Sequence, residues 1–175
     1  MCITSGPSKM SKTIIYAGDA KYMGKHVHVL AYQNKAISIG DKPNAMLLPI
    51  PSAGPINYDN LIDTREFKNF LNDMVDATKL NVKSLGFDSD NLKSINVFEV
   101  GSYHIITGNS APGIFESIKQ IPEEKRPEIT LEFLQEYALN YPGFQLMLCC
   151  WVGAIEAEPI LMWYEPFSAH ELFIP

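Results

Sequence analysis

The feature that most constrains this 175-residue chain is a nearly unbroken apolar run over residues 144–152, Phe-Gln-Leu-Met-Leu-Cys-Cys-Trp-Val. A short run without polar alternation is typical of a β-strand that is buried on both faces. The most apolar stretch, residues 146–155, is far shorter than the ~20 residues that span a bilayer. We therefore expect a central strand of a covered sheet, and no membrane segment.

The remaining periodicities predict three strands, a helix, two strands, two helices and three strands, in that order. Runs of strands separated by helices, without strict alternation, indicate an α+β fold. We expect one domain over residues 1–175, with an antiparallel-rich sheet covered by about three helices. The predicted strands are residues 13–17, 25–32, 45–50, 95–100, 103–107, 144–152, 159–164 and 171–174; the predicted helices follow Asp63, Gly113 and Thr130; residues 81–91 form a polar surface connection.

Local signals predict where several of these elements end. Gly18-Asp19 is a turn pair that closes the first strand, and Pro49 favours a sheet edge or a strand end. Asp63 and Glu66 have the spacing of a capping box, with the aspartate as N-cap. An apolar stripe behind them favours a helix. The stripe consists of Phe67, Phe70, Leu71, Met74 and Val75.

Charge and cysteine content exclude several classes of protein. Twenty acidic residues against 14 basic ones give a net charge of −6, and the basic residues are scattered, so we expect no nucleic-acid partner. The cysteines are Cys2, Cys149 and Cys150. This low, odd count argues against a disulfide scaffold. The N-terminus lacks the features of a signal peptide, so a cytoplasmic location is predicted.

Cys2 directly follows the initiator methionine. Removal of Met1 would leave a free α-amine beside the Cys2 thiol. An α-amine has a pKa of about 8 and could accept the thiol proton. Nucleophile and general base would then belong to one residue.

In its Met-Cys start the chain resembles the N-terminal-nucleophile hydrolases, especially their acylase and amidotransferase branches. The resemblance covers roughly the first 20 residues. These families fold as four-layer αββα sandwiches and follow the cysteine with a strand and a polar turn residue, which Asp19 matches. The resemblance implies a cofactor-free hydrolase of a small amide or ester. Cys2 would be its nucleophile, Asp19 would orient the amine, and Asn109, Asn34 or Asn44 would donate to an oxyanion.

A metal site is another interpretation of the sequence. His26 and His28 lie two residues apart on a predicted strand, so both side chains face the same side. Paired histidines of this kind bind zinc when a third ligand converges on them. His104 or His170 would have to supply that ligand.

The alternative to a hydrolase is a non-catalytic domain that binds an unidentified small molecule or protein. Such a domain would use a sheet face or the aromatic segment at residues 163–167, Trp-Tyr-Glu-Pro-Phe. Cys149 and Cys150 alternate within the apolar strand and are expected to be core residues. If the last strand, residues 171–174, forms a sheet edge, it would also favour a homo-oligomer.

Overall fold

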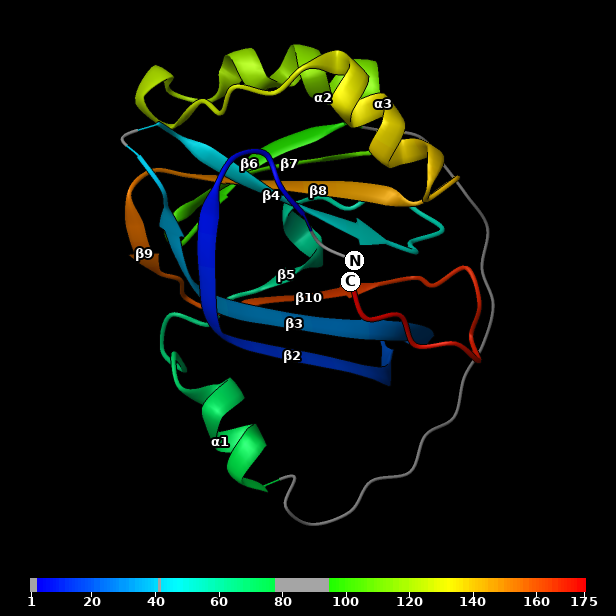
Figure 1. Cartoon of the computed structure of the whole chain (residues 1–175). Helices are drawn as coiled ribbons and strands as arrows, with labels where there is room; N and C mark the ends of the chain where they lie inside the picture. Colours follow the sequence, from blue (N-terminus) through cyan, green and yellow to red (C-terminus); the bar gives the residue numbers. More distant parts are fainter. Residues whose placement is uncertain (1–2, 41, 78–94) are drawn as a thin grey trace.

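The computed structural model describes residues 3–40, 42–77 and 95–175, which build two antiparallel sheets and three α-helices (Figure 1). The predicted α+β class is confirmed. The strands divide into two sheets, whereas the sequence indicated one. The strands form two sheets because the chain crosses from one layer to the other. The periodicity along a single strand does not reveal such a crossing.

The first sheet, sheet A, has the apolar run near its centre. Its order is β1 (Ile3–Thr4), β4 (Asn44–Ile50), β8 (Gln145–Trp151), β7 (Tyr103–Gly108) and β6 (Asn96–Val100). Every residue of β8 is buried, as predicted for the apolar run. Pro49 lies near the end of β4, beyond the two residues that pair with β1. The N–H that proline lacks is therefore not needed for a hydrogen bond between β4 and β1.

The second sheet, sheet B, is built on a long hairpin. Its order is β2 (Ser8–Tyr22), β3 (Lys25–Ser38), β10 (Ile160–Tyr164) and β5 (Leu61–Ile62), and β9 (Ala154–Glu156) also pairs with β3. The predicted turn at Gly18-Asp19 is wrong, because β2 continues through both residues to a turn at Met23-Gly24. The Tyr16 side chain lies over Gly18, which explains why glycine is accommodated within the strand.

The layers are stacked in the order helices, sheet A, sheet B, helix (Figure 1). Helices α2 (Ala111–Ser117) and α3 (Leu131–Leu139) cover the outer face of sheet A, and α1 (Phe70–Ala77) lies against sheet B. Short 3-10 helices join these elements: η1 (Tyr58–Asn60), η2 (Ile118–Gln120) and η3 (Glu123–Lys125). Alternation along the strands gives sheet A two apolar faces, one toward sheet B and one toward α2 and α3.

Buried polar side chains connect the layers. The Tyr103 hydroxyl of sheet A donates a 2.8 Å hydrogen bond to Asn34 Oδ1 of sheet B. At one edge of the sandwich, Asn44 accepts from the backbone N–H of Gly6 and donates to the carbonyls of Gly6 and Pro7. Asn44 thereby holds the segment that passes from sheet A into sheet B.

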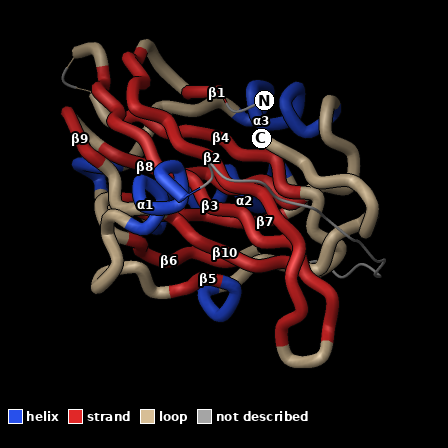
Figure 2. Tube along the Cα trace, turned by 90° about the horizontal axis from the view of Figure 1, so that it is seen from below, coloured by secondary structure: helices blue, strands red, loops and turns tan. Residues whose placement is uncertain are grey.

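The opposite edge of the sandwich is the more open one. Strands β5 and β6 are the last strands of their sheets and lie on the same side of the molecule (Figure 2). The Ile56 carbonyl accepts hydrogen bonds from Asn96 and Thr107, so the loop before η1 closes part of this edge. The candidate site lies at this edge, beside the β6–β7 turn.

Two further local predictions are corrected by the structure. Asp63 does not cap a helix, because its carboxylate binds Arg65, and α1 begins only at Phe70. Residues 171–174 form no strand; Phe173 packs against Tyr141 and Phe144 by its ring. The predicted hairpin around 101–102 and the helix start at Thr130 are confirmed. The second helix begins earlier than predicted, because α2 starts at Ala111 with Ser110 as its N-cap and includes Gly113. The predicted connection at 81–91 falls outside the described residues.

Candidate binding cleft at the open edge

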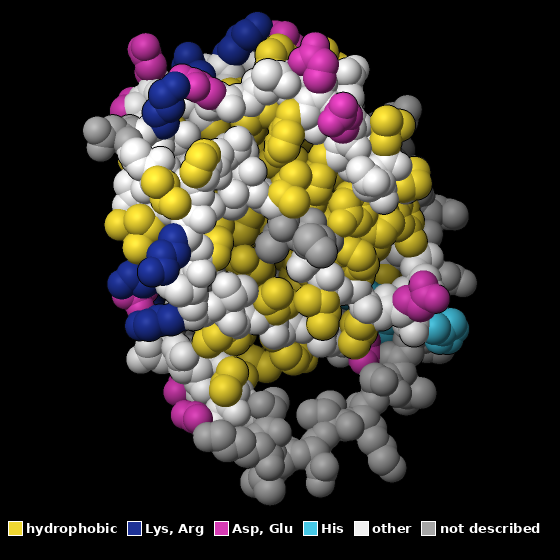
Figure 3. All heavy atoms as spheres, viewed as in Figure 1, with side chains coloured by type: hydrophobic (Ala, Val, Ile, Leu, Met, Phe, Trp, Pro, Cys, Tyr) yellow, Lys and Arg dark blue, Asp and Glu magenta, His cyan; other side chains and the backbone are white. Residues whose placement is uncertain are grey.

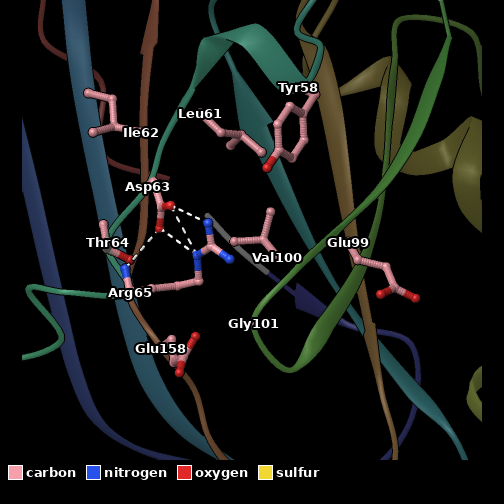
Figure 4. Close-up of a pocket in the computed structure, with 10 residues that line it drawn as sticks. All are labelled: Tyr58, Leu61, Ile62, Asp63, Thr64, Arg65, Glu99, Val100, Gly101 and Glu158. Atoms are coloured by element: carbon pink, nitrogen blue, oxygen red, sulfur yellow. Dashed lines mark hydrogen bonds and ion pairs between the residues drawn. The ribbon is translucent and has the colours of Figure 1, made fainter.

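A cleft of about 400 Å³ lies between the open edges of the two sheets (Figure 4). One wall comes from β5 and the segment after it, and the other from the end of β6 and its turn. The residues that line it are Tyr58, Leu61, Ile62, Asp63, Thr64, Arg65, Glu99, Val100, Gly101 and Glu158. Three separate parts of the chain therefore build one hollow.

Apolar side chains form part of this lining. Leu61 and Val100 also pack against the core between the sheets, and the Tyr58 ring meets Phe98 edge-on at 6.2 Å between centroids. The position of Tyr58 follows from a local cap: the Asn57 side chain accepts from the backbone N–H of Asp59 at the start of η1. This cap fixes the turn that leads into β5.

The ion pair between Asp63 and Arg65 is the polar feature of one wall. Asp63 Oδ1 accepts from Arg65 Nε at 2.9 Å and from its backbone N–H at 3.0 Å, while Nη2 reaches Oδ2 at 2.5 Å. These hydrogen bonds lower the pKa of Asp63 to about 2 and raise that of Arg65. Because both side chains are well exposed, the pair adds little to stability. Its consequence is a guanidinium held in a fixed orientation.

Glu158 stands at the junction of the two walls. Its carboxylate lies 2.5 Å from Lys68 Nζ, and it packs against Gly101 in the β6–β7 turn. Gly101 has a φ of +53°, a conformation that glycine adopts without strain. The contact brings the turn of sheet A against the segment that precedes β10 of sheet B.

The charge of the cleft lining is negative. Asp63, Glu99 and Glu158 supply three carboxylates, against the guanidinium of Arg65 and the ammonium of Lys68 beside Glu158, a net formal charge of −1. Glu99 is also 2.5 Å from His104, and its side chain remains 71% exposed. The lining therefore favours cationic groups, and its apolar part suits the aliphatic stem of a long side chain.

The residues predicted for a hydrolase do not lie in this cleft. Cys2 is outside the described residues. Asp19 lies on β2, faces sheet A, and its carboxylate is 3.6 Å from His26 Nε2. Asn109 follows β7 and directly precedes Ser110, the N-cap of α2. Asp19 thus lies in sheet B, Asn109 follows a strand of sheet A, and the two are not joined by any hydrogen bond in the described structure.

The other candidate oxyanion donors have structural partners. Asn34 is buried, accepts from Tyr103, and directs its amide at Tyr32 and two methionine sulfurs. Asn44 holds the crossing from sheet A to sheet B. Both amides are therefore used in connecting the layers.

The predicted histidines separate into two places. His26 and His28 do face the same side, toward the core between the sheets, with ring centroids 5.7 Å apart. His104 lies on the outer face of sheet A near Lys125. Among residues 3–40, 42–77 and 95–175, no group of three or more metal-ligating side chains forms. The structure does not bring the proposed three-histidine set together.

His28 is the most buried of these histidines. Burial lowers its pKa below the ordinary value of 6.5, and the nearby His26 acts in the same direction. The Ala169 backbone and the Asp19 carboxylate oppose that shift. Burial therefore favours the neutral form of His28.

Cys149 and Cys150 point to opposite faces of β8, as alternation predicts. Cys149 belongs to the core between the sheets and Cys150 to the core beneath α2 and α3. Both are fully buried, and burial raises the pKa of Cys150 to about 12. Neither position suits a reactive thiol.

The aromatic C-terminal segment packs largely on the body of the protein. The Trp163 ring meets that of Tyr22 at a tilt of 44° with 5.0 Å between centroids, and Phe167 contacts Phe144 at 5.7 Å between centroids. A second hollow, of about 600 Å³, lies beside Phe144, Phe167 and Phe173. In Figure 3 hydrophobic side chains are visible over a broad part of one face of the molecule.

Sequence reasoning missed the cleft because none of its lining residues forms a motif. Arg65, Glu99 and Glu158 are far apart in the sequence and meet only through the pairing of strands. The one local signal is Asp63-x-Arg65, two opposite charges at a predicted helix start, where the spacing of Asp63 and Glu66 favours a cap instead.

Comparison with protein-family models, with curated proteins and with solved structures finds no significant match for this chain. Within the described part of the chain, none of the helices has the length and apolar character needed to cross a bilayer.

Proposed function

We propose that this protein is a binding domain whose ligand occupies the cleft between β5 and β6. The observation that carries the proposal is the cleft itself, a hollow of about 400 Å³ at the open edge of the sandwich. Its size falls within the usual range of ligand pockets, roughly 300–1,000 Å³. Its lining combines apolar side chains with a few oriented charges, as binding sites commonly do.

The test is a ligand screen read out on the protein itself. A library of small amines, guanidines and carboxylates is added to ¹⁵N-labelled protein, and amide chemical shifts are followed. The proposal expects shifts that cluster at Leu61, Arg65 and Val100. Glu158→Gln, which neutralises a lining carboxylate, should weaken binding of an amine or guanidine. Lys42→Ala, which removes an exposed ion pair with Glu128 away from the cleft, should not. A screen in which no compound moves these amides contradicts the proposal.

A second candidate function is the cofactor-free hydrolase with Cys2 as nucleophile. The layer order of the fold favours it, because helices, two sheets and a helix are stacked as in the αββα families that the Met-Cys start resembles. Its test is hydrolysis of small activated esters and amides by protein from which Met1 has been removed. Turnover should disappear in Cys2→Ser and persist in Cys149→Ser. Equal rates in wild type and Cys2→Ser would eliminate this candidate.

A further inference from the structure

We propose that the outer edge of β6 binds an extended peptide carrying lysine or arginine side chains, which adds to sheet A as a further strand. This inference rests on the proposed binding function and specifies the partner of the same cleft.

The backbone of β6 presents unpaired groups at the edge of the sheet. Val100 and Tyr103 flank the two-residue turn and face each other, as do Phe98 and Ile105. Residues that flank such a turn exchange both backbone hydrogen bonds, and the pattern alternates along the strands. The N–H and C=O groups of Val97 and Glu99 therefore point away from β7, where no described strand lies.

The strands at the other sheet edges are either shorter than the five-residue β6 or interrupted by an irregularity. Strands β1 and β5 have only two residues each. Strand β2 is long, but it has an irregularity between Ser11 and Ile14, with Lys12 at a φ of +52°. Bulges and lysines on an edge prevent pairing with another chain. Strand β6 has a regular register over five residues and contains no lysine, proline or irregularity.

An added strand would place alternate side chains over the acidic lining. Residues of neighbouring strands share faces, so one set would lie on the side of Val100, toward Arg65 and Glu158, and the other on the side of Glu99. Carboxylates stand on both sides. Glu158 has Lys68 beside it at 2.5 Å, and the lining together with Lys68 retains a net formal charge of −1.

Charge also favours a foreign peptide over a second copy of this chain as the partner of β6. A second copy carries a net charge of −6 and would bring the same acidic lining against itself. Like charges placed together disfavour pairing, whereas a basic segment is attracted. The main-chain hydrogen bonds would supply affinity and the basic side chains specificity, as in other cases of strand addition.

The experiment uses two labelled ten-residue peptides, one alternating lysine and threonine and one alternating glutamate and threonine, with fluorescence anisotropy as readout. The proteins are wild type, Glu99→Pro, Glu99→Gln and, as a charge control elsewhere, Glu132→Gln. Proline at position 99 removes an outward N–H without taking a donor from the β7 ladder. Both Glu99 variants lose the carboxylate, so their difference isolates the backbone group.

The inference expects the lysine peptide to bind wild type at least about tenfold more tightly than the glutamate peptide. Glu99→Pro should weaken it by about tenfold, and Glu99→Gln by about threefold or less, because an exposed ion pair contributes little. Glu132→Gln should bind like wild type. A lysine peptide methylated on the backbone nitrogens facing β6 should bind weakly to wild type, which keeps the test valid if Glu99→Pro does not fold.

Equal binding of the lysine peptide to wild type and Glu99→Pro would overturn the inference, as would equal binding of the normal and methylated peptides. So would a wild-type dimer that Glu99→Pro dissociates, since the occupant would then be a second copy. If neither peptide binds but small compounds still shift the amides of Leu61 and Arg65, the peptide inference fails and the proposed binding function stands. If neither the peptides nor the small compounds bind, both the peptide inference and the proposed binding function fail.

Discussion

A Cβ atom added to Gly101 would lie 2.9 Å from Glu158 Oε2, closer than such contacts normally come. Gly101 belongs to the β6–β7 turn of sheet A, and Glu158 to the segment before β10 of sheet B. The absence of a side chain at position 101 therefore allows the two sheets to approach each other at one side of the cleft.

Gly101→Ala should destabilise the protein for two reasons. The residue has a φ of +53°, where a non-glycine residue costs about 1–2 kcal/mol, and its methyl group would also meet Glu158. Gly24→Ala is the matched control, because Gly24 has a φ of +80° in the other hairpin turn and open space around its added Cβ. Chemical denaturation should show the larger loss for Gly101→Ala.

The difference between the two alanine variants should shrink in a Glu158→Ser background, because the contacting carboxylate is then gone. Equal losses for Gly101→Ala and Gly24→Ala in the wild-type background would contradict the close approach of Gly101 and Glu158.

Tyr103→Phe should cost about 1–3 kcal/mol of unfolding free energy. It removes the 2.8 Å hydrogen bond to Asn34 and leaves the buried Asn34 Oδ1 without its donor. Replacing Asn34 by leucine as well should recover part of the loss, because no unpaired amide then remains. Urea unfolding of the two single variants and the double variant measures this coupling. If the losses of unfolding free energy in the two single variants simply add in the double variant, Tyr103 and Asn34 are not energetically coupled.

Stability should fall on acidification through His28. Its folded-state pKa is lowered below 6.5 by burial, so the unfolded state takes up the proton first. The contribution of neutral His28 is fully present above pH 6.5 and is lost as the pH falls through the lowered folded-state value. His26 and Asp19 also face this ring, so the comparison needs a variant at position 28 alone. His28→Leu should lose less stability than wild type between about pH 7.5 and about pH 5.5. Unfolding free energies of wild type and His28→Leu that change equally with pH would contradict this prediction.

Thiol labelling should separate Cys2 from the two core cysteines. Cys149 and Cys150 are fully buried, so a maleimide added to native protein should leave both unmodified. All three cysteines should react in denaturant. Intact mass measurement counts the adducts and also reports whether Met1 is retained, which would preclude the hydrolase mechanism. More than one adduct on native wild type, or any adduct on native Cys2→Ser, would show that a core thiol is accessible.

Much of the fold could be predicted from local patterns. The apolar run that became β8, the hairpin of β6 and β7 and the caps of α2 and α3 are each encoded by adjacent residues. Gly18-Asp19 and residues 171–174 show the limit of this reasoning. The turn pair lies within a strand because pairing with β3 continues past it, and the final segment is held by aromatic contacts with distant residues.

The candidate site was beyond such patterns. Its walls come from residues near 60, near 100 and near 158, and only the order of strands in two sheets brings them together. Asp63 illustrates the ambiguity: an aspartate before an apolar stripe is the usual start of a helix, yet here its carboxylate binds Arg65. Such competition between a cap and an ion pair depends on the tertiary surroundings.

The most direct test of the central claim is an amide chemical-shift map of the wild-type protein titrated with the alternating lysine-threonine peptide. We predict that the largest shifts occur at Val97 and Glu99 on β6 and at Leu61 and Arg65 across the cleft, and that they saturate. Shifts centred instead on Phe144 and Phe167 in the C-terminal hollow, or no saturable shifts at the cleft, would contradict the assignment of this edge as the binding site.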